Sequence, residues 1–267
     1  MTRRSDAIVA GAPAAARPPA AKTTGARRKR PKRSRLTGDE REAMFARLSA
    51  QRPEPKAELE FSDPYTLLVA VTLSAQATDA GVNRATRVLF RDAPDPAAMV
   101  ALGVDGVGER IRTIGLWRNK ARNVVALSEA LLSEHGGAVP RTREALTALP
   151  GVGRKTANVV LNIGFGEPAM AVDTHIFRLG NRIGLAPGKT PDEVEQGLYR
   201  AVPEPYLRDA HHWLILHGRY VCKARKPDCA ACVIADLCKW KEKTSDTPAP
   251  VVEAPPNGPV RAVDAGL

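Results

Sequence analysis

The chain has 267 residues, 43% of them hydrophobic, and a formal net charge of +11. No apolar run approaches the ~20 residues that a membrane-spanning helix needs, and four cysteines in a chain of this length do not make a disulfide scaffold. The composition therefore argues against a membrane span and against a small secreted disulfide fold.

The positive charge is concentrated in the N-terminal tail. Residues 1–36 hold eleven Lys/Arg against one Asp, which gives +10, and residues 247–267 carry −1. The remaining 210 residues therefore account for only about +2 of the total of +11. The high isoelectric point belongs to the tail, so it says little about whether the folded body binds a polyanion.

The N-terminal tail, residues 1–36, is predicted to be disordered, because its Ala/Pro stretches and basic cluster at 27–35 can bury little apolar surface. It is either a mobile, salt-dependent contact to a polyanion or a solvated extension. Pro13, Pro18 and Pro19 interrupt the apolar segment needed for an export signal, and they also oppose the helix of a mitochondrial presequence. Residues 247–267 are rich in Pro, Val and Ala and predict a second disordered tail.

Between the tails, the sequence predicts short helices separated by turns. Capping boxes begin at Thr37 and Thr190, the second with proline at the first helical position. Asp63-Pro64 starts a helix that continues to residue 71. Sustained period-2 alternation is absent, so the predicted fold class is all-α, with enough residues for two small lobes. Further helices are predicted at 79–90, 120–132, 143–148, 154–163, 174–183 and 208–221.

A glycine hairpin followed by a lysine is the most informative motif of the chain. Residues 149–160 read LPGVGRKTANVV, in which Gly151 and Gly153 supply a sharp turn and the following residues begin a helix. The free N–H groups and the positive end of such a helix form an anion site. The same field disfavours a cation, so we expect it, together with partial burial, to favour the neutral amine of Lys155.

This motif also allows simpler interpretations. Glycine turns before helices are common, and Asp173, eighteen positions beyond Lys155, is on its own more often a helix cap than a catalyst. A nucleotide-hydrolase phosphate loop is excluded, because that loop needs four residues between its glycines and here there is one.

All four cysteines lie within seventeen residues, with the spacing Cys-x6-Cys-x2-Cys-x5-Cys. The clustering indicates one tetrathiolate metal site. Zinc sites usually pair two Cys-x2-Cys knuckles, and only one knuckle is present, so an iron–sulfur cluster is favoured over zinc, with a disulfide pair third. The candidate ligands are Cys222, Cys229, Cys232 and Cys238.

Together, these motifs resemble the endonuclease III family of bifunctional DNA glycosylases, which belongs to the helix-hairpin-helix superfamily. The resemblance runs from about residue 37 to residue 246, and only the tails lie outside it. The matching segments, besides the cysteines, are 73–79 (LSAQATD), 113–116 (TIGL), 149–160, 172–175 (VDTH) and 211–218 (HHWLILHG).

The resemblance implies two helical lobes on either side of a DNA-binding cleft. Residues 57–167 would form a six-helix lobe that carries the helix-hairpin-helix. Residues 37–56 would join residues 168–246 in a lobe that holds a [4Fe-4S] cluster. The implied substrate is damaged double-stranded DNA with an oxidised pyrimidine. We expect a monomer without a membrane partner, in the cytoplasm at the nucleoid of a bacterium, or in the mitochondrion or nucleus of a eukaryote.

The resemblance also implies residue roles. Lys155 would attack the sugar C1′ and form a Schiff base that permits strand cleavage by β-elimination, and Asp173 would take a proton or stabilise the cationic sugar. The DNA contacts would be Gln76 and Leu116, which fill the space left by the extruded base, the backbone N–H groups of Gly151, Val152 and Gly153 at a phosphate, and Arg154.

Other residues carry weaker expectations. Glu58 and His175 are candidates for the base pocket, with a structural histidine as the alternative for His175. His211, His212 and Trp213 lie in an apolar helix and are predicted to be core residues without chemistry. Basic residues between the first two cysteines are either DNA contacts or a solvated loop, and they are Lys223, Arg225 and Lys226.

Two rival functions remain at this point. A monofunctional adenine-type glycosylase shares the hairpin and the cluster, but that family typically lacks a lysine at the position of Lys155 and carries a large C-terminal domain. A noncatalytic iron–sulfur DNA-binding protein is the rival from another class. Covalent trapping through Lys155 would distinguish the bifunctional enzyme from both.

Overall fold

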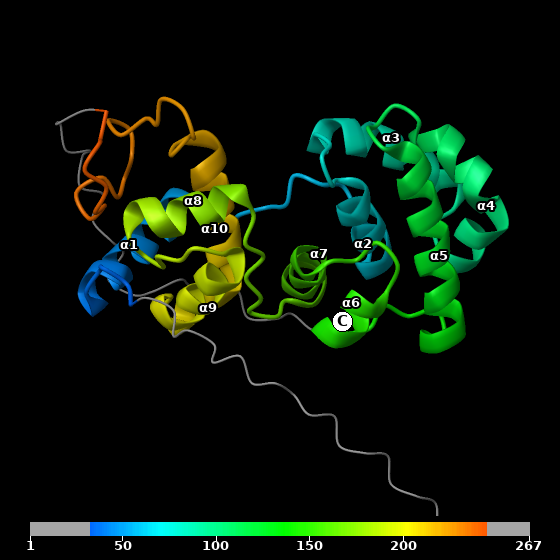
Figure 1. Ribbon diagram of the computed structural model, residues 1–267, viewed down its shortest axis with the longest axis horizontal. Helices are drawn as coiled ribbons and strands as arrows, with labels where there is room; N and C mark the ends of the chain where they lie inside the picture. Colours follow the sequence, from blue (N-terminus) through cyan, green and yellow to red (C-terminus); the bar gives the residue numbers. More distant parts are fainter. Residues whose placement is uncertain (1–32, 245–267) are drawn as a thin grey trace, which may run out of the picture. The chain divides into compact units, whose positions relative to one another are not determined.

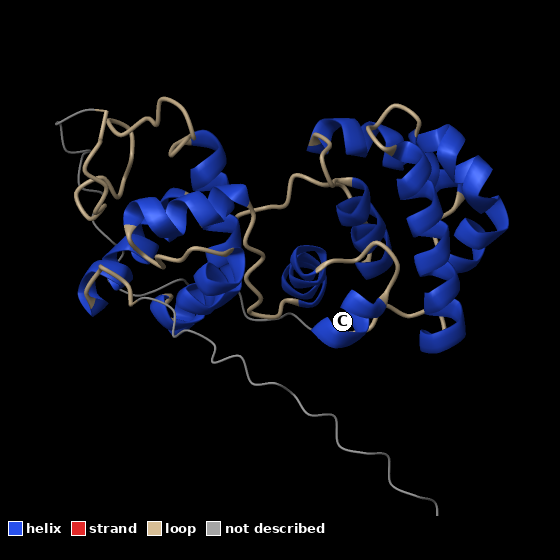
Figure 2. Ribbon diagram, viewed as in Figure 1, coloured by secondary structure: helices blue, strands red, loops and turns tan. Residues whose placement is uncertain are grey.

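The computed structural model describes residues 33–244, and this part of the chain is helical without strands (Figure 2). The predicted all-α fold class is therefore confirmed. Within the same residues, no helix is long and apolar enough to cross a bilayer. The helices are α1 (Gly38–Gln51), α2 (Pro64–Leu73), α3 (Asp79–Asp92), α4 (Pro96–Ile111), α5 (Trp117–His135), α6 (Arg143–Ala148), α7 (Arg154–Val159), the π-helix η1 (Val160–Gly164), α8 (Thr174–Ile183), α9 (Pro191–Ala201), the 3-10 helix η2 (Glu204–Tyr206) and α10 (Leu207–Tyr220).

Several helices begin where the sequence places a cap. Thr37 forms both halves of a capping box with Glu40, and Asp63 caps α2 ahead of Pro64. The second predicted capping box is only half formed. Thr190 accepts from the backbone N–H of Glu193, but the Glu193 carboxylate instead accepts from the N–H of Lys189, at 2.8 Å.

Two helical segments differ from the prediction. Helix α4 was not predicted, because glycines break its periodicity, and Gly103 has φ 69° inside it. The helix predicted at 154–163 is α7 followed directly by the π-helix η1, which shifts the register of the last turns.

The described residues form two main hydrophobic cores, and Figure 1 shows the helices that contribute to them. The first is built from α2 to α7, and the second from α1, α8, α9, α10 and the segment around residues 232–235. A small third cluster joins α2 to the α7–η1 segment through Leu67, Val71, Val159 and Ala171. The lobe boundaries at residues 57 and 167 stay a prediction.

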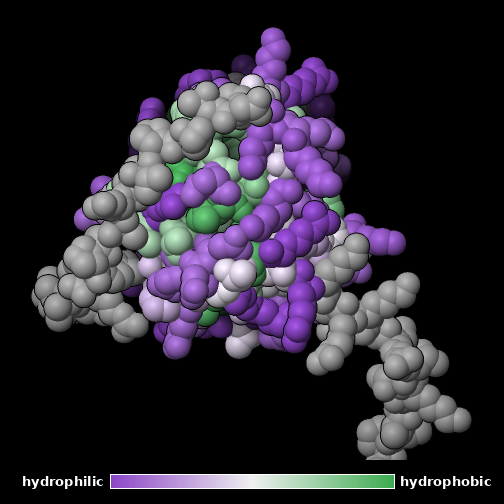
Figure 3. Space-filling view, turned by 90° about the vertical axis from the view of Figure 1, so that its left-hand side faces the viewer, coloured by the Kyte–Doolittle hydropathy of each residue, from purple (hydrophilic) through white to green (hydrophobic). Residues whose placement is uncertain are grey.

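The predicted N-terminal tail ends in packed structure. Leu36 is buried in the second core, and the N–H of Arg35 donates to the carbonyl of Gly184 at 2.8 Å. Packing thus begins before residue 37, whereas residues 1–32 and 245–267 lie outside the described part. Figure 3 views the side formed by the second-core helices, where hydrophilic side chains surround a small hydrophobic patch.

Candidate active site and metal centre

The hairpin between α6 and α7 is a tight turn. Gly151 has φ 76°, in the left-handed region that favours glycine. The N–H of Val152 donates to the carbonyl of Leu149 at 3.1 Å, and the Val152 side chain is buried in the first core. Sequence and turn geometry therefore agree on why this position needs glycine.

The backbone donors at the hairpin are only partly free. The N–H groups of Gly151 and Gly153 have no acceptor among residues 33–244, and no side chain caps α7. Both glycines are exposed. The N–H of Val152 donates within the turn, so of the three predicted phosphate donors only those of Gly151 and Gly153 are free; the contact of Val152 to a phosphate stays a prediction.

Lys155 lies at a cavity of about 600 Å³, counted with its open mouth. Three helices contribute one row of side chains each, at the spacing that puts residues on a single helix face. The rows are Lys155, Val159 and Ile163 from the α7–η1 segment, His211, Ile215 and Arg219 from α10, and Leu67, Val71 and Ser74 from α2.

The Lys155 amine makes no hydrogen bond or ion pair with any of the described residues, and the residue is exposed. Lys155 is therefore not partly buried, whereas we expected partial burial to favour its neutral amine. The amine is free to meet a ligand that enters the cavity.

His211 and His212 were predicted to be core residues without chemistry, and this is only half right. His211 is 2% exposed, yet both rings line the cavity, and their Nδ1 atoms have no hydrogen-bond partner within residues 33–244. Burial, with smaller contributions from His212, Lys155 and Arg219, lowers the pKa of His211 to about 3. His211 is therefore neutral at neutral pH and presents an uncharged polar wall.

Asp173 caps α8. Its Oδ1 accepts from the N–H groups of His175 and Ile176, at 2.9 and 2.8 Å. Its Oδ2 has no hydrogen-bond partner within residues 33–244. The helix-cap interpretation is thus realised, and one oxygen remains available for chemistry.

His175 is held away from the cavity. Its Nδ1 lies 3.2 Å from the guanidinium of Arg178, and its Cβ packs toward the position of Gly218. It is absent from the residues that line the cavity with Lys155. This placement favours the structural alternative for His175.

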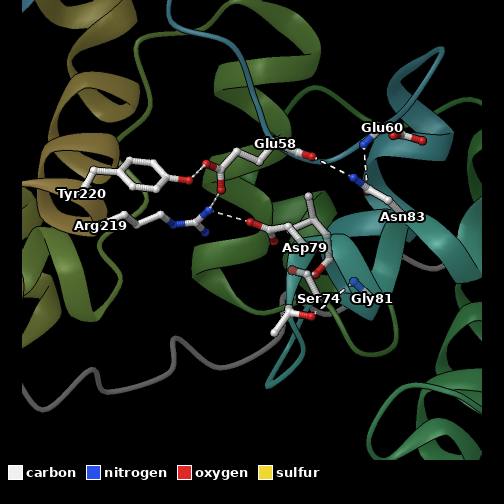
Figure 4. A network of polar contacts seen from close by, with 10 residues as sticks. Glu58, Glu60, Ser74, Asp79, Gly81, Asn83, Arg219 and Tyr220 are labelled. Atoms are coloured by element: carbon white, nitrogen blue, oxygen red, sulfur yellow. Dashed lines mark hydrogen bonds and ion pairs between the residues drawn. The ribbon is translucent and has the colours of Figure 1, made fainter.

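Glu58 lines the cavity and is held by the end of α10 (Figure 4). Its carboxylate accepts from Arg219 and from the Tyr220 hydroxyl, and Arg219 also donates to Asp79 at 2.6 Å. Asn83 of α3 donates to the Glu58 carbonyl at 2.9 Å. Sequence reasoning missed Arg219 and Tyr220, although Arg219 continues the row of His211 and Ile215 at the i+4 spacing.

Gln76 and Leu116 adopt strained backbone conformations. Only three non-glycine residues of the described chain have positive φ, and two of them are Gln76 (56°) and Leu116 (60°). Leu116 is 59% exposed, which excludes a core leucine. A Cβ on Gly115 would lie 3.9 Å from the Gln76 carbonyl oxygen, so the two loops are adjacent. Strain of this kind clusters at binding and catalytic sites.

Arg154 is paired within the protein. Its Nε and Nη2 donate to the two carboxylate oxygens of Glu195, at 2.8 and 3.0 Å. The Glu195 side chain is 4% exposed. The geometry therefore does not support the predicted DNA contact of Arg154, because its guanidinium is hydrogen-bonded to Glu195 of α9.

The four cysteine thiols are free and line one small cavity. Burial, with the other three thiols, raises the pKa of Cys232 to about 12, a penalty that coordination to a metal would remove. Within residues 33–244, no three His, Cys, Asp or Glu side chains gather around a single metal ion position. An all-thiol donor set around one cavity, with Arg182 and Lys243 beside it, fits an anionic iron–sulfur cluster.

The loop between the first two cysteines is exposed at Lys223, Arg225 and Lys226. Lys226 is the third non-glycine residue with positive φ, at 50°. Arg182 of α8 donates to the Lys223 carbonyl at 2.8 Å and so holds the start of the loop.

A helical hairpin with free backbone donors, an unpaired amine at a cavity and a tetrathiolate site define the class of helix-hairpin-helix DNA repair proteins with an iron–sulfur domain. Two sequence profiles match accordingly. Residues 69–204 match the HhH-GPD superfamily of base excision DNA repair proteins, and residues 222–238 match the iron–sulfur binding domain of endonuclease III.

Comparison with individual proteins narrows the class. Endonuclease III of Escherichia coli K12 is 57% identical over 200 residues, which cover 75% of this chain and 95% of the relative. The protein of the same name from Haemophilus influenzae is 55% identical with the same coverage. The chain belongs to the endonuclease III family. Its cofactor is a [4Fe-4S] cluster.

Solved structures agree with this assignment. A trapped covalent intermediate of endonuclease III with DNA matches with a TM-score of 0.72 and 42% identity, over 76% of this chain and 96% of that one. A thermostable thymine-DNA glycosylase matches with a TM-score of 0.69 over the same shares, and at 24% identity it supports the fold alone. The curated relatives named above are bacterial.

Proposed function

We propose that this protein is a DNA glycosylase with abasic-site lyase activity that removes oxidised pyrimidines from duplex DNA. The observation that carries the proposal is the unpaired amine of Lys155 at the cavity between α2, α7 and α10. An amine can both displace a base and form an imine with the sugar, which a hydroxyl or thiol cannot do. The covalent DNA complex of a relative supports this chemistry.

In the proposed reaction, the Lys155 nitrogen bonds to C1′ while the bond from C1′ to the base breaks. The base leaves with the electron pair and takes up a proton, and ring opening of the sugar gives a protonated imine. The imine acidifies a C2′ proton, whose removal expels the 3′ phosphate by β-elimination. Water then hydrolyses the imine and returns the free lysine.

Asp173 is proposed to assist through the carboxylate oxygen that does not cap α8. That oxygen would take the proton lost by the amine, or stabilise the positive charge that develops on the sugar as the base leaves. The cap itself holds the carboxylate in place, because two backbone donors fix Oδ1.

The damaged nucleotide must leave the stack before Lys155 can reach it, which costs a few kcal/mol. We propose that the cavity beside Lys155 takes the extruded base, with Glu58 and the neutral His211 on its walls. Gln76 and the exposed Leu116 would fill the gap left in the duplex. Their adjacent, strained loops support this role.

Backbone contacts would hold the DNA on both sides of the lesion. The free N–H groups of Gly151 and Gly153 are proposed to donate to a phosphate, helped by the start of α7. The basic loop 223–226 would contact the backbone further along.

Cys222, Cys229, Cys232 and Cys238 are proposed to hold the [4Fe-4S] cluster. When bound, it cross-links the 222–238 segment and thereby shapes the basic loop; base excision and β-elimination need no electron from it. We place the protein at the chromosome in the bacterial cytoplasm.

Borohydride trapping on a thymine-glycol duplex tests the proposal. Wild type should form a covalent adduct, whereas Lys155→Gln should form none and still bind the duplex. Lys189→Gln, an exposed lysine outside the cavity, is the matched control and should trap like wild type. If wild type binds but is not trapped, the chain is a monofunctional glycosylase or a noncatalytic DNA-binding protein instead.

A further inference from the structure

The α7–η1 segment carries two adjacent rows of side chains. The row described above, Lys155, Val159 and Ile163, faces the cavity. The residues just before each of these form a second row, Arg154, Asn158 and Asn162, which is polar. Asn158 and Asn162 are buried.

Every member of the polar row bonds a group outside the α7–η1 segment. Asn158 Nδ2 donates to the Met170 carbonyl at 2.9 Å, and Asn162 Nδ2 donates to the Arg208 carbonyl at 2.8 Å. Arg154 makes its paired bonds to Glu195 of α9. Met170 and Val194, the residue before Glu195, belong to the second core, whereas Ala157 of α7 belongs to the first.

Glu195 also contacts α6, the first helix of the hairpin. Arg143 of α6 places Nη1 3.5 Å from Glu195 Oε1. A single carboxylate that is almost fully buried therefore meets one guanidinium from each helix of the hairpin. Removing one partner of a buried charged pair leaves the other uncompensated, so this contact strongly favours one arrangement.

Successive residues of a helix point about 100° apart. Fixing the row that starts at Arg154 therefore fixes the rotation of α7 about its own axis, and with it the direction of Lys155. The fork geometry matters here, because only a bidentate guanidinium sets an orientation as well as a distance.

We propose that Glu195 is a positioning residue, which holds α7 through Arg154 so that the Lys155 amine points into the cavity. This inference rests on the proposed function of Lys155. Arg154 would then make an internal contact that fixes the rotation of α7, in place of a contact to a DNA phosphate.

Arg154→Lys and Glu195→Gln test the two roles of Arg154 against each other. Lysine keeps the positive charge that a phosphate contact needs, but it lacks the fork, and glutamine removes the buried charge at unchanged size. Single-turnover borohydride trapping and the Kd for an uncleavable abasic-analogue duplex are measured for each. We expect both variants to trap roughly tenfold or more slowly, since small displacements of a reacting group have effects of this size, with Kd within about twofold of wild type.

The double variant should trap no more slowly than Glu195→Gln alone, because that change already removes the charged contact between Arg154 and Glu195, together with the charge that faces Arg143. Asp92→Asn is the control, since it removes a surface ion pair of 2.7 Å to Arg110 that does not line the cavity. It should trap at the wild-type rate, because a surface pair contributes little to the fold.

Trapping by Glu195→Gln at the wild-type rate would overturn the positioning role and leave the proposed function intact. A weaker Kd for Arg154→Ala, with normal trapping by Arg154→Lys, would overturn it in favour of a phosphate contact. If wild type itself is not trapped, the proposed function fails and the positioning role fails with it.

Discussion

Replacing Gly151 by alanine should damage the hairpin, whereas the same change at Gly153, two residues away, should not. Gly151 has φ 76°, and an added Cβ would lie 2.8 Å from Cβ and Nδ2 of Asn123 on α5. Gly153 has φ −91°, and its added Cβ would meet nothing within 4 Å. The pair is therefore a matched test of backbone geometry.

The size of the effect follows from two contributions. A left-handed backbone costs a residue with a Cβ about 1–2 kcal/mol, and overpacking adds about 1–3 kcal/mol. The Asn123 side chain can rotate its amide away, but its Cβ is fixed to α5, so the hairpin or the helix must move. A loss of about 2–5 kcal/mol lowers Tm by on the order of 10 °C in a protein of this size.

Thermal and urea unfolding of the two variants measure this difference. Gly151→Ala should also bind an abasic-analogue duplex more weakly, because the turn that presents the backbone donors is displaced. Gly153→Ala should keep the wild-type Tm, so any loss of DNA affinity there reports on close approach of the phosphate alone. A Gly151→Ala variant as stable as wild type would refute the reasoning.

Three further predictions concern Leu116, His211 and the metal site. Leu116→Gly should relieve the left-handed strain and raise the free energy of unfolding by about 1 kcal/mol, yet slow excision; lower stability in urea would contradict this. His211 has a folded pKa of about 3, below its unfolded value of 6.5. Below pH 6.5 the unfolded chain therefore binds a proton that the folded chain does not. Its contribution should reduce stability as pH falls toward 3, by about 2 kcal/mol at pH 5 relative to pH 8. His211→Gln should flatten the urea-unfolding stability profile across that window, and an unchanged slope would count against the burial of a neutral ring. Cys229→Ser should lose the visible absorbance of the cluster and should lower Tm; full absorbance in that variant would exclude Cys229 as a ligand.

Local chemistry made much of the fold predictable from sequence. Caps at Thr37 and Asp63 mark helix starts because their side chains satisfy backbone donors within three residues. The Gly151 turn is equally local. Helix α4 was not predicted, because Gly103 interrupts its apolar pattern.

The contacts that complete the site were not predictable in the same way. Arg154 and Glu195 are forty-one residues apart, and Arg219 and Glu58 are 161 apart, so nothing local specifies either pair. Arg154 beside Lys155 was therefore interpreted as a DNA contact, although its partner is a buried carboxylate. The rows of α7 and α10 that face each other become visible only once the helices are packed.

The identity of the nucleophile is the central claim, and peptide mapping of the trapped complex tests it most directly. After borohydride reduction on a damaged duplex, nuclease and protease digestion leave one peptide with a reduced sugar remnant, which mass spectrometry locates. We expect the modification on Nζ of Lys155. A modification on another amine, such as Lys56 at the same cavity, would contradict the account.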